Sequence, residues 1–200
     1  EFDKSIKMLN GIKNQPEKKF THFDWKLDFP EVLNPLVAGE NSGFDIVIGN
    51  PPYLKERGNA HIFKPVNESA FGEKWHQGKM DYWFYFLHKA MDITKEDSNI
   101  AFITSRYWLN SQGAKKLIVR VSKNLSFVNV VDIGKLKVFD KVAGHHMIAI
   151  YQKAKKEKFI YKQLKEDVKA ISSKGESENL RISELNNSDV FQSGGEVVLA

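Results

Sequence analysis

Four consecutive residues, Asn50-Pro51-Pro52-Tyr53, combine reactive side chains with a backbone that has little freedom. Each proline fixes its own φ and restricts the residue before it to extended conformations, so the Asn50 amide is held in one orientation. The Asn50 side-chain oxygen and a neighbouring backbone carbonyl are two acceptors, which suit both hydrogens of an exocyclic amine such as N6 of adenine. Accepting both hydrogens favours the pyramidal nitrogen that attacks a methyl donor, so no strong base is needed. Tyr53 adds a ring on which a base can stack, a contact worth roughly 1–3 kcal/mol.

The segment before this tetrapeptide predicts the strand that positions it. Phe44–Gly49 contains the apolar run Ile46-Val47-Ile48, which is typical of a parallel strand covered on both faces. Open α/β sheets bind ligands just beyond the carboxyl ends of such strands, where Asn50 would lie. Asn-Pro and Pro-Pro pairs also occur in ordinary turns, so a turn without function is the alternative.

The rest of the chain predicts helices and strands of an α/β fold. Apolar residues recur at helical spacing over 81–94, and a second helix is expected over 112–124. Strands of the buried type are expected at 100–104, 127–133 and 147–152. The order of these segments predicts a sheet with flanking helices.

This pattern resembles the gamma-class adenine-N6 DNA methyltransferases, in particular the methylase domains of type IIG restriction-modification enzymes and related phage-defence methyltransferases. The likeness runs from about Phe23 to Lys153. It rests on these segments: Phe23-Asp24-Trp25, Phe29-Pro30-Glu31-Val32, Asn50-Pro51-Pro52-Tyr53, Asp81-Tyr82, Ile100-Ala101-Phe102-Ile103-Thr104, Val138-Phe139 and His145-His146-Met147-Ile148. The resemblance implies a partial Rossmann-like, S-adenosylmethionine-dependent methyltransferase sheet. This chain would supply its fourth to seventh strands, with the last strand antiparallel between its neighbours.

The resemblance also implies a reaction and the residues that perform it. The reaction is methyl transfer from S-adenosylmethionine to an adenine flipped out of double-stranded DNA. Asn50, Pro51, Pro52 and Tyr53 would be catalytic, and Asn50 and Pro52 would also lie beside the cofactor. Phe139 matches a position where the family carries a second ring, so Tyr53 and Phe139 would stack on the two faces of the base and offset the few kcal/mol that extrusion costs. A core Phe at a strand end is the alternative for Phe139.

Two further pairs of residues could belong to a site. Asp81 and Tyr82 match a family position near the cofactor and target pocket, but an Asp before an amphipathic helix is also a good N-cap, and we favour the cap. His145 and His146 have no third ligand at useful spacing, and methyl transfer from a sulfonium needs no metal. No metal site is therefore expected.

The segment before the first predicted strand is short. Only 43 residues precede Phe44, and they contain no G-x-G turn that could bind the cofactor. We therefore expect the carboxyl-terminal half of a methyltransferase domain, which alone binds S-adenosylmethionine weakly or not at all and is inactive. The strand at 44–49 would be a sheet edge, covered by residues 1–19 or by a second copy in a homodimer.

The chain carries a net charge of +5, which permits nucleic-acid binding. Lysines are concentrated after residue 152, and four of them are candidate contacts to DNA phosphates: Lys153, Lys155, Lys156 and Lys158. A solvated lysine-rich helix or linker is the alternative. Three parts are expected: a lead-in at 1–43, the catalytic half at 44–153, and a basic stretch and linker at 154–200 that leads toward a DNA-specificity domain.

Composition excludes several classes of protein. Without cysteine, the chain has no disulfide and no thiolate metal site. It has no apolar stretch long enough to span a membrane and no signal peptide, so a soluble cytoplasmic protein is expected. Two other functions remain open. One is a protein-glutamine or RNA methyltransferase, in which Phe139 has no stacking role, and the other is a non-catalytic DNA-binding or assembly module.

Overall fold

The computed structural model describes residues 23–139, 144–165, 168, 179–192 and 195–199. Tertiary contacts divide the chain into a first unit, Glu1–Ser42, and a second unit, Gly43–Ala200. The expected cover of the sheet edge by residues 1–19 lies outside the described residues, as do residues 169–178 of the stretch at 154–200 that was expected to be a basic stretch and linker.

The described part of the first unit consists of three short helices: α2 (Trp25–Asp28), α3 (Pro30–Leu33) and α4 (Pro35–Ala38). The Asp24 side chain caps α2 by accepting hydrogen bonds from the backbone N–H groups of Lys26 (2.8 Å) and Leu27 (3.1 Å). Asp28 accepts from the Asp24 N–H at 2.7 Å. Both carboxylates therefore satisfy local backbone groups.

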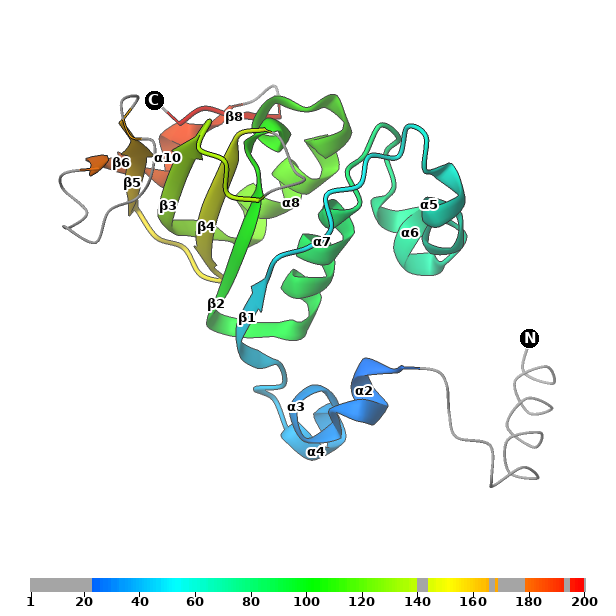
Figure 1. Ribbon diagram of the computed structural model, residues 1–200. Helices are drawn as coiled ribbons and strands as arrows, with labels where there is room; N and C mark the ends of the chain where they lie inside the picture. Colours follow the sequence, from blue (N-terminus) through cyan, green and yellow to red (C-terminus); the bar gives the residue numbers. More distant parts are fainter. Residues whose placement is uncertain (1–22, 140–143, 166–167, 169–178, 193–194, 200) are drawn as a thin grey trace, which may run out of the picture. The chain divides into compact units, whose positions relative to one another are not determined.

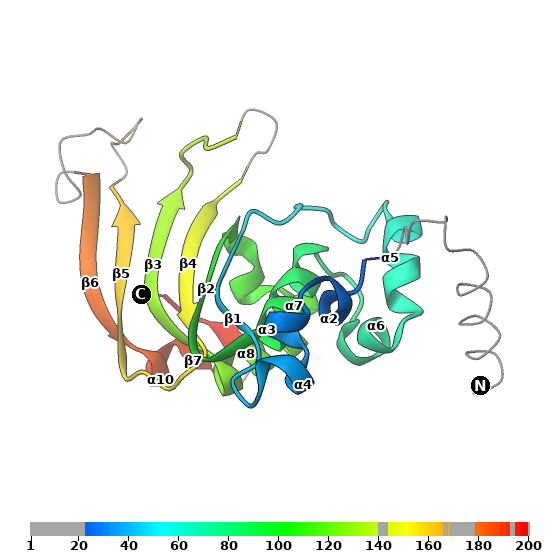
Figure 2. The same cartoon turned by 90° about the horizontal axis from the view of Figure 1, so that it is seen from below.

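The second unit is built on a six-stranded sheet (Figures 1 and 2). Its strands are β1 (Phe44–Gly49), β2 (Thr94–Ser105), β3 (Ser126–Gly134), β4 (His146–Gln152), β5 (Lys158–Leu164) and β6 (Leu180–Asn186). They are arranged in the order β1-β2-β4-β3-β5-β6. β1, β2, β3 and β5 run in one direction, and β4 is antiparallel to both of its neighbours, β2 and β3. The expected antiparallel insertion is confirmed.

Strand β1 lies at one edge of this sheet, as expected. The expectation that it is covered on both faces is wrong for this structure. Val47 packs against the core, whereas Ile46 and Ile48 are 59% and 77% exposed. Alternate residues of a strand point to opposite faces, so only one face of β1 contributes to the core.

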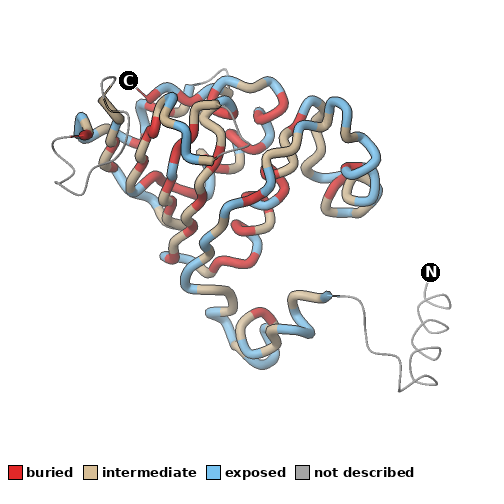
Figure 3. Tube along the Cα trace, viewed as in Figure 1, coloured by how far each residue is buried: buried red, intermediate tan, exposed pale blue. Residues whose placement is uncertain are grey.

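Helices pack against the sheet and enclose the core. α7 (Trp83–Ile93) and α8 (Lys115–Asn124) are the two helices expected from apolar spacing, and α8 is preceded by short 3-10 turns at Arg106–Asn110 and Gln112–Ala114. Figure 3 shows buried residues gathered where these helices meet the central strands. The largest fully buried side chains include Trp83, Trp108, Tyr151, Phe63 and Phe127. Two smaller helices, α5 (Ala60–Asn67) and α6 (Ala70–Trp75), precede α7.

The sheet continues beyond residue 153, where a basic stretch and linker were expected. Phe159 and Tyr161 in β5 are each 2% exposed, while Lys158 is exposed, so β5 alternates between a buried and a solvated face. A short helix α10 (Asn187–Val190) and the two-stranded pair β7 (Phe191–Gln192) and β8 (Glu196–Val197) follow β6. Within the described ranges, no helix combines the length and apolar character needed to cross a membrane.

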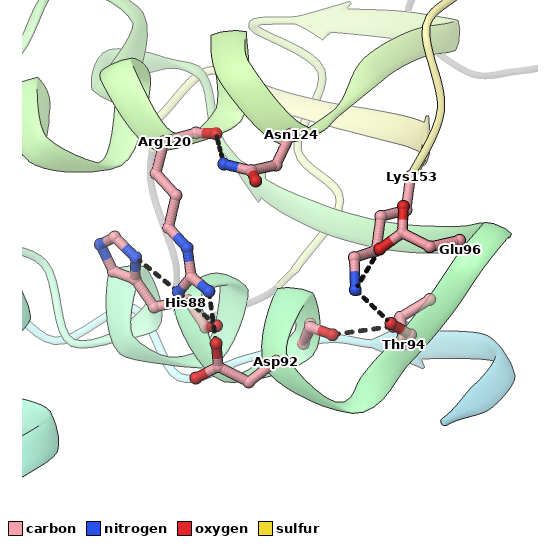
Figure 4. A network of polar contacts seen from close by, with 8 residues as sticks. His88, Asp92, Thr94, Glu96, Arg120, Asn124 and Lys153 are labelled. Carbon is pink, nitrogen blue, oxygen red and sulfur yellow. Dashed lines mark hydrogen bonds and ion pairs between the residues drawn. The ribbon is translucent and has the colours of Figure 1, made fainter. Parts of the chain in front are cut away.

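A partly buried polar network joins α7 to α8 (Figure 4). Arg120 forms an ion pair with Asp92 and donates to the backbone oxygen of His88 at 2.9 Å. The Trp75 ring stacks on His88 at 4.2 Å, and the Arg120 guanidinium lies 4.2 Å from the centre of that Trp75 ring. Burial and the Arg120 charge lower the pKa of His88 to about 3, so His88 is neutral in the folded protein.

The low pKa of His88 predicts that the protein loses stability in mild acid. Below pH 6.5 the unfolded chain protonates His88 and the folded chain does not, so the unfolded state binds more protons and the free energy of unfolding falls as the pH decreases toward 3. The loss should reach about 2 kcal/mol at pH 5. Urea unfolding at pH 8 and pH 5 measures it, and His88→Gln should remove about that much of the difference. His61→Gln, at an exposed position, is the control. An identical pH dependence in wild type and His88→Gln would contradict the prediction.

Candidate active site

The tetrapeptide Asn50-Pro51-Pro52-Tyr53 directly follows β1, at the end of the sheet where β2, β3 and β5 also have their carboxyl ends (Figure 2). Pro51 is buried and Asn50 is exposed. No group in the described part of the chain hydrogen-bonds to the Asn50 side chain. The amide is therefore available to a ligand at this end of the sheet.

The residues after the tetrapeptide are fixed to the segment that precedes α7. Lys55 forms a β-bridge with Asp81, and the Tyr82 N–H donates to the Leu54 carbonyl at 2.7 Å. The Glu56 N–H donates to the Met80 carbonyl at 2.9 Å. The loop is thus held by β1 on one side and by this bridge on the other, which limits the motion of Asn50.

The Glu56 side chain adds two further contacts to this bridge. One carboxylate oxygen lies 2.6 Å from Nε2 of His76, and the other accepts from the Met80 N–H at 3.2 Å. The Glu56 side chain is 19% exposed, so its contacts are partly shielded from water. They reinforce the connection between the loop and the start of α7.

Three rings form an aromatic cluster beside the loop: Tyr53, Phe139 and His146. The ring centres of Tyr53 and Phe139 are 6.3 Å apart, with 59° between the ring planes. His146 lies 5.6 Å from Tyr53 and 5.4 Å from Phe139. The structure therefore brings together the two rings that were expected to hold a base. A base between two parallel rings needs about 7 Å between them, so these tilted rings must open slightly to admit one.

The Tyr53 ring is held in place by its hydroxyl group, which donates to the Ile103 carbonyl in β2 at 2.8 Å. Burial and the nearby Asp81 charge raise the pKa of Tyr53 to about 12. The phenol is therefore neutral and keeps this hydrogen bond over the physiological pH range.

His146 was not expected to be part of the site. It is the first residue of β4 and pairs with Ser105 in β2 and Gly134 in β3, which places it at the same end of the sheet as Asn50. Its side chain is buried, and burial lowers its pKa, so the ring is neutral at pH 7. The antiparallel direction of β4 was the signal that could have located His146 here.

The expectation that Asp81 caps α7 is wrong. The N-cap is Tyr82, and no side chain caps the helix. The Asp81 backbone pairs with Lys55 instead, and the buried Oδ1 of Asp81 has no hydrogen-bond partner among the described residues. Burial raises the pKa of Asp81, and the Lys55 charge partly offsets this effect. Asp81 lines a cavity of about 120 Å³ with Lys55, Tyr107 and others.

Comparison with known families identifies the chain. Residues 1–139 match the sequence model of the Eco57I restriction-modification methylase domain. The chain belongs to this family. Members of the Eco57I family are methyltransferases of restriction-modification systems, and the matched region includes both the tetrapeptide and Phe139.

Three curated relatives of this Eco57I-family chain share 22–25% sequence identity with it. The type II methyltransferase M.HincII of Haemophilus influenzae is 24% identical over 132 residues, which cover 64% of this chain and 26% of that protein. The type II restriction enzyme and methyltransferase RM.Eco57I of Escherichia coli is 22% identical over 136 residues, 67% of this chain and 13% of that protein. The adenine-specific methyltransferase PglX of Lacticaseibacillus casei is 25% identical and covers 72% of this chain and 12% of its own length. The chain spans roughly a quarter or less of these relatives.

Solved structures share the fold. The type IIG restriction endonuclease BpuSI matches with a TM-score of 0.52 and 14% identity, over 72% of this chain and 19% of that one. A modification subunit of a putative type I restriction enzyme from Vibrio vulnificus matches with a TM-score of 0.53 and 15% identity, over 80% of this chain and 37% of that one. The expected methyltransferase-type α/β sheet is confirmed.

The four lysines considered as phosphate contacts lie away from the tetrapeptide of this Eco57I-family chain. They follow β4, at the opposite end of the sheet from Asn50 (Figure 2). Three of them contact the protein itself: Lys153 bonds to the Thr94 carbonyl (2.7 Å) and Glu96 (3.0 Å), Lys155 to the Ser122 carbonyl (3.0 Å), and Lys158 to Glu184 (2.7 Å) (Figure 4 for Lys153). The structure does not bring these lysines, or Lys156 between them, to the site.

Proposed function

We propose that this chain carries the methyl-acceptor side of a site-specific adenine-N6 DNA methyltransferase in a type II (IIG) restriction-modification or phage-defence system. The observation that carries the proposal is the exposed Asn50 amide, held on a stiff loop with the rings of Tyr53 and Phe139 beside it. Membership of a restriction-modification methylase family supports methyl transfer, and the ring pair favours a planar base as acceptor.

The proposed chemistry begins with the target amino group. The Asn50 side-chain oxygen and an adjacent main-chain carbonyl accept one hydrogen bond each from this group, which keeps its lone pair available. The lone pair forms the bond to the methyl carbon while the carbon–sulfur bond of the donor breaks, and the nitrogen then releases one proton to solvent. Tyr53 and Phe139 hold the base plane during this step.

S-Adenosylmethionine is the methyl donor in this proposal, and it supplies an electrophilic methyl group on a sulfonium. The residues present fit only part of such a cofactor. Asn50 and Pro52 would lie beside the methyl group, but the sequence before β1 contains no Gly-rich turn of the kind that binds the rest of the molecule. Isothermal titration of the 200-residue chain should therefore show no binding at micromolar cofactor. A micromolar dissociation constant would contradict this part of the proposal.

The proposal includes a cytoplasmic location and duplex DNA as the partner. Pairing of two copies through the edge strand β1 also belongs to it, because none of the described strands pairs with the outer side of β1 and a strand edge can accept a further strand.

The test uses the intact protein that carries this chain, labelled S-adenosylmethionine and three acceptors: duplex DNA, RNA and a glutamine-containing protein. Mass spectrometry of the digested products should find N6-methyladenine from the duplex alone. Label confined to RNA or to glutamine would replace the proposal by the corresponding alternative. DNA binding without any transfer would identify a non-catalytic module.

A further inference from the structure

A basic cavity lies over the carboxyl ends of β3 and β5. Its volume is about 700 Å³. The charged and titratable residues that line it are Arg106, Asp132, Lys135, Lys137, His145 and Lys165. Among the described residues that line it, four side chains are cationic and one is a carboxylate. We propose that this cavity binds the phosphodiester backbone of duplex DNA near the target base. The inference rests on the proposed function and adds the residues that hold the DNA strand.

The geometry of Arg106 supports a phosphate as the ligand. Its Nε lies 2.6 Å from Oδ2 of Asp132, a carboxylate that is only 5% exposed, and its backbone N–H donates to the His145 carbonyl at 2.8 Å. These contacts fix the side chain, which is nevertheless 32% exposed at the cavity. A fixed guanidinium with an open edge suits a phosphate, because its planar donors match two phosphate oxygens.

A second contact holds Asp132 in place. The Tyr161 hydroxyl donates to Asp132 Oδ2 at 3.1 Å. Burial and the Asp132 charge raise the pKa of Tyr161 to about 12, so this hydroxyl remains a donor at neutral pH. Asp132 thus neutralises and positions Arg106, and the exposed Lys135 is a second cation at the cavity.

The position of the cavity fits a strand of DNA whose base enters the aromatic cluster. Lys135 and Lys137 line the cavity and precede Phe139 in the same connection between β3 and β4. His146 of the aromatic cluster begins β4, and β3 and β5 are one and two strands from β4, or about 5 and 10 Å at about 4.8 Å per strand. Since DNA advances about 3.4 Å per base pair, the cavity would contact phosphates about one to three base pairs from the target.

The matched variants are Lys135→Ala and Lys156→Ala, which remove the same charge from exposed positions at opposite ends of the sheet. Duplex affinity of the intact protein is measured between 50 and 200 mM salt. Lys135→Ala should reduce the slope of log affinity against log salt by about 0.9, equally for unrelated DNA sequences. Lys156→Ala should leave the slope at the wild-type value.

Arg106→Lys is a second, independent variant. It keeps the charge and the ion pair with Asp132 but loses the planar fork, so duplex affinity should fall about tenfold without a change in the salt slope. Thermal unfolding of each variant, matched to wild type, separates this effect from loss of structure. If Arg106→Lys is destabilised, Lys135→Ala alone decides the question.

The outcomes separate this inference from the proposed function. Wild-type methylation of duplex DNA with an unchanged slope in Lys135→Ala would overturn the cavity and keep the function. A reduced slope in Lys156→Ala but not in Lys135→Ala would place the phosphate contact at the other end of the sheet. A wild-type protein that neither binds nor methylates duplex DNA would overturn both.

Discussion

Asn50→Ala in the intact protein should slow methyl transfer by about 10²–10³-fold, because it removes one of the two acceptors that prepare the target amine. Duplex affinity should change little, because base-edge contacts at one nucleotide add little to the many phosphate contacts. Single-turnover kinetics measures the chemical step without the contribution of product release.

The matched control is Asn124→Ala. Its amide donates to the Arg120 carbonyl at 2.8 Å within α8 (Figure 4). Asn124 ends α8 just before the amino end of β3, whereas Asn50 lies at the carboxyl ends of the parallel strands. This variant should methylate DNA at the wild-type rate. Retention of more than about a tenth of the activity in Asn50→Ala would contradict the proposed role, because the loss of one preorganised contact is expected to slow the reaction by about 10²-fold or more.

Removal of either ring of the Tyr53–Phe139 pair should weaken the hold on an extruded base. Each stacking contact is worth roughly 1–3 kcal/mol, so Tyr53→Ala and Phe139→Ala should each lower single-turnover kcat/KM by about 5- to 150-fold. A fluorescent adenine analogue at the target position reports extrusion directly. Its fluorescence increase on binding should be smaller in both variants.

Tyr53→Phe separates stacking from positioning. It keeps the ring and removes only the hydroxyl that donates to the Ile103 carbonyl. Activity within a few-fold of wild type is expected, because one neutral hydrogen bond contributes about 1 kcal/mol. If Tyr53→Phe loses as much activity as Tyr53→Ala, the hydroxyl group rather than the ring face is what matters, and the stacking role fails.

The features that could be predicted from the sequence are those set by local rules. Two prolines restrict their own and the preceding backbone regardless of context, so the loop at Asn50 and the strand before it were predictable from residues 44–53 alone. Apolar spacing located α7 and α8 for the same reason, because one buried helical face leaves a periodic trace. The proximity of Tyr53 and Phe139 could be predicted only from the family resemblance, because the two residues are far apart in the sequence and no rule of local structure relates them.

The features that were missed depend on contacts between distant segments. The lysines of β5 led to the prediction of a basic stretch, whereas the buried Phe159 and Tyr161 at alternate positions are typical of a strand. Asp81 was expected to cap a helix, but its backbone pairs with Lys55 instead. The basic cavity combines four separate parts of the chain, which periodicity and composition cannot bring together.

The bridge between the catalytic loop and the start of α7 has a dynamic consequence. The Glu56 and Tyr82 amides are each bonded to a carbonyl on the opposite segment. They can exchange hydrogen with water only when the two segments separate. Such an opening would also release Asn50 from its fixed orientation, so under the proposed function the fraction of molecules able to transfer a methyl group would depend on local opening at the beginning of α7.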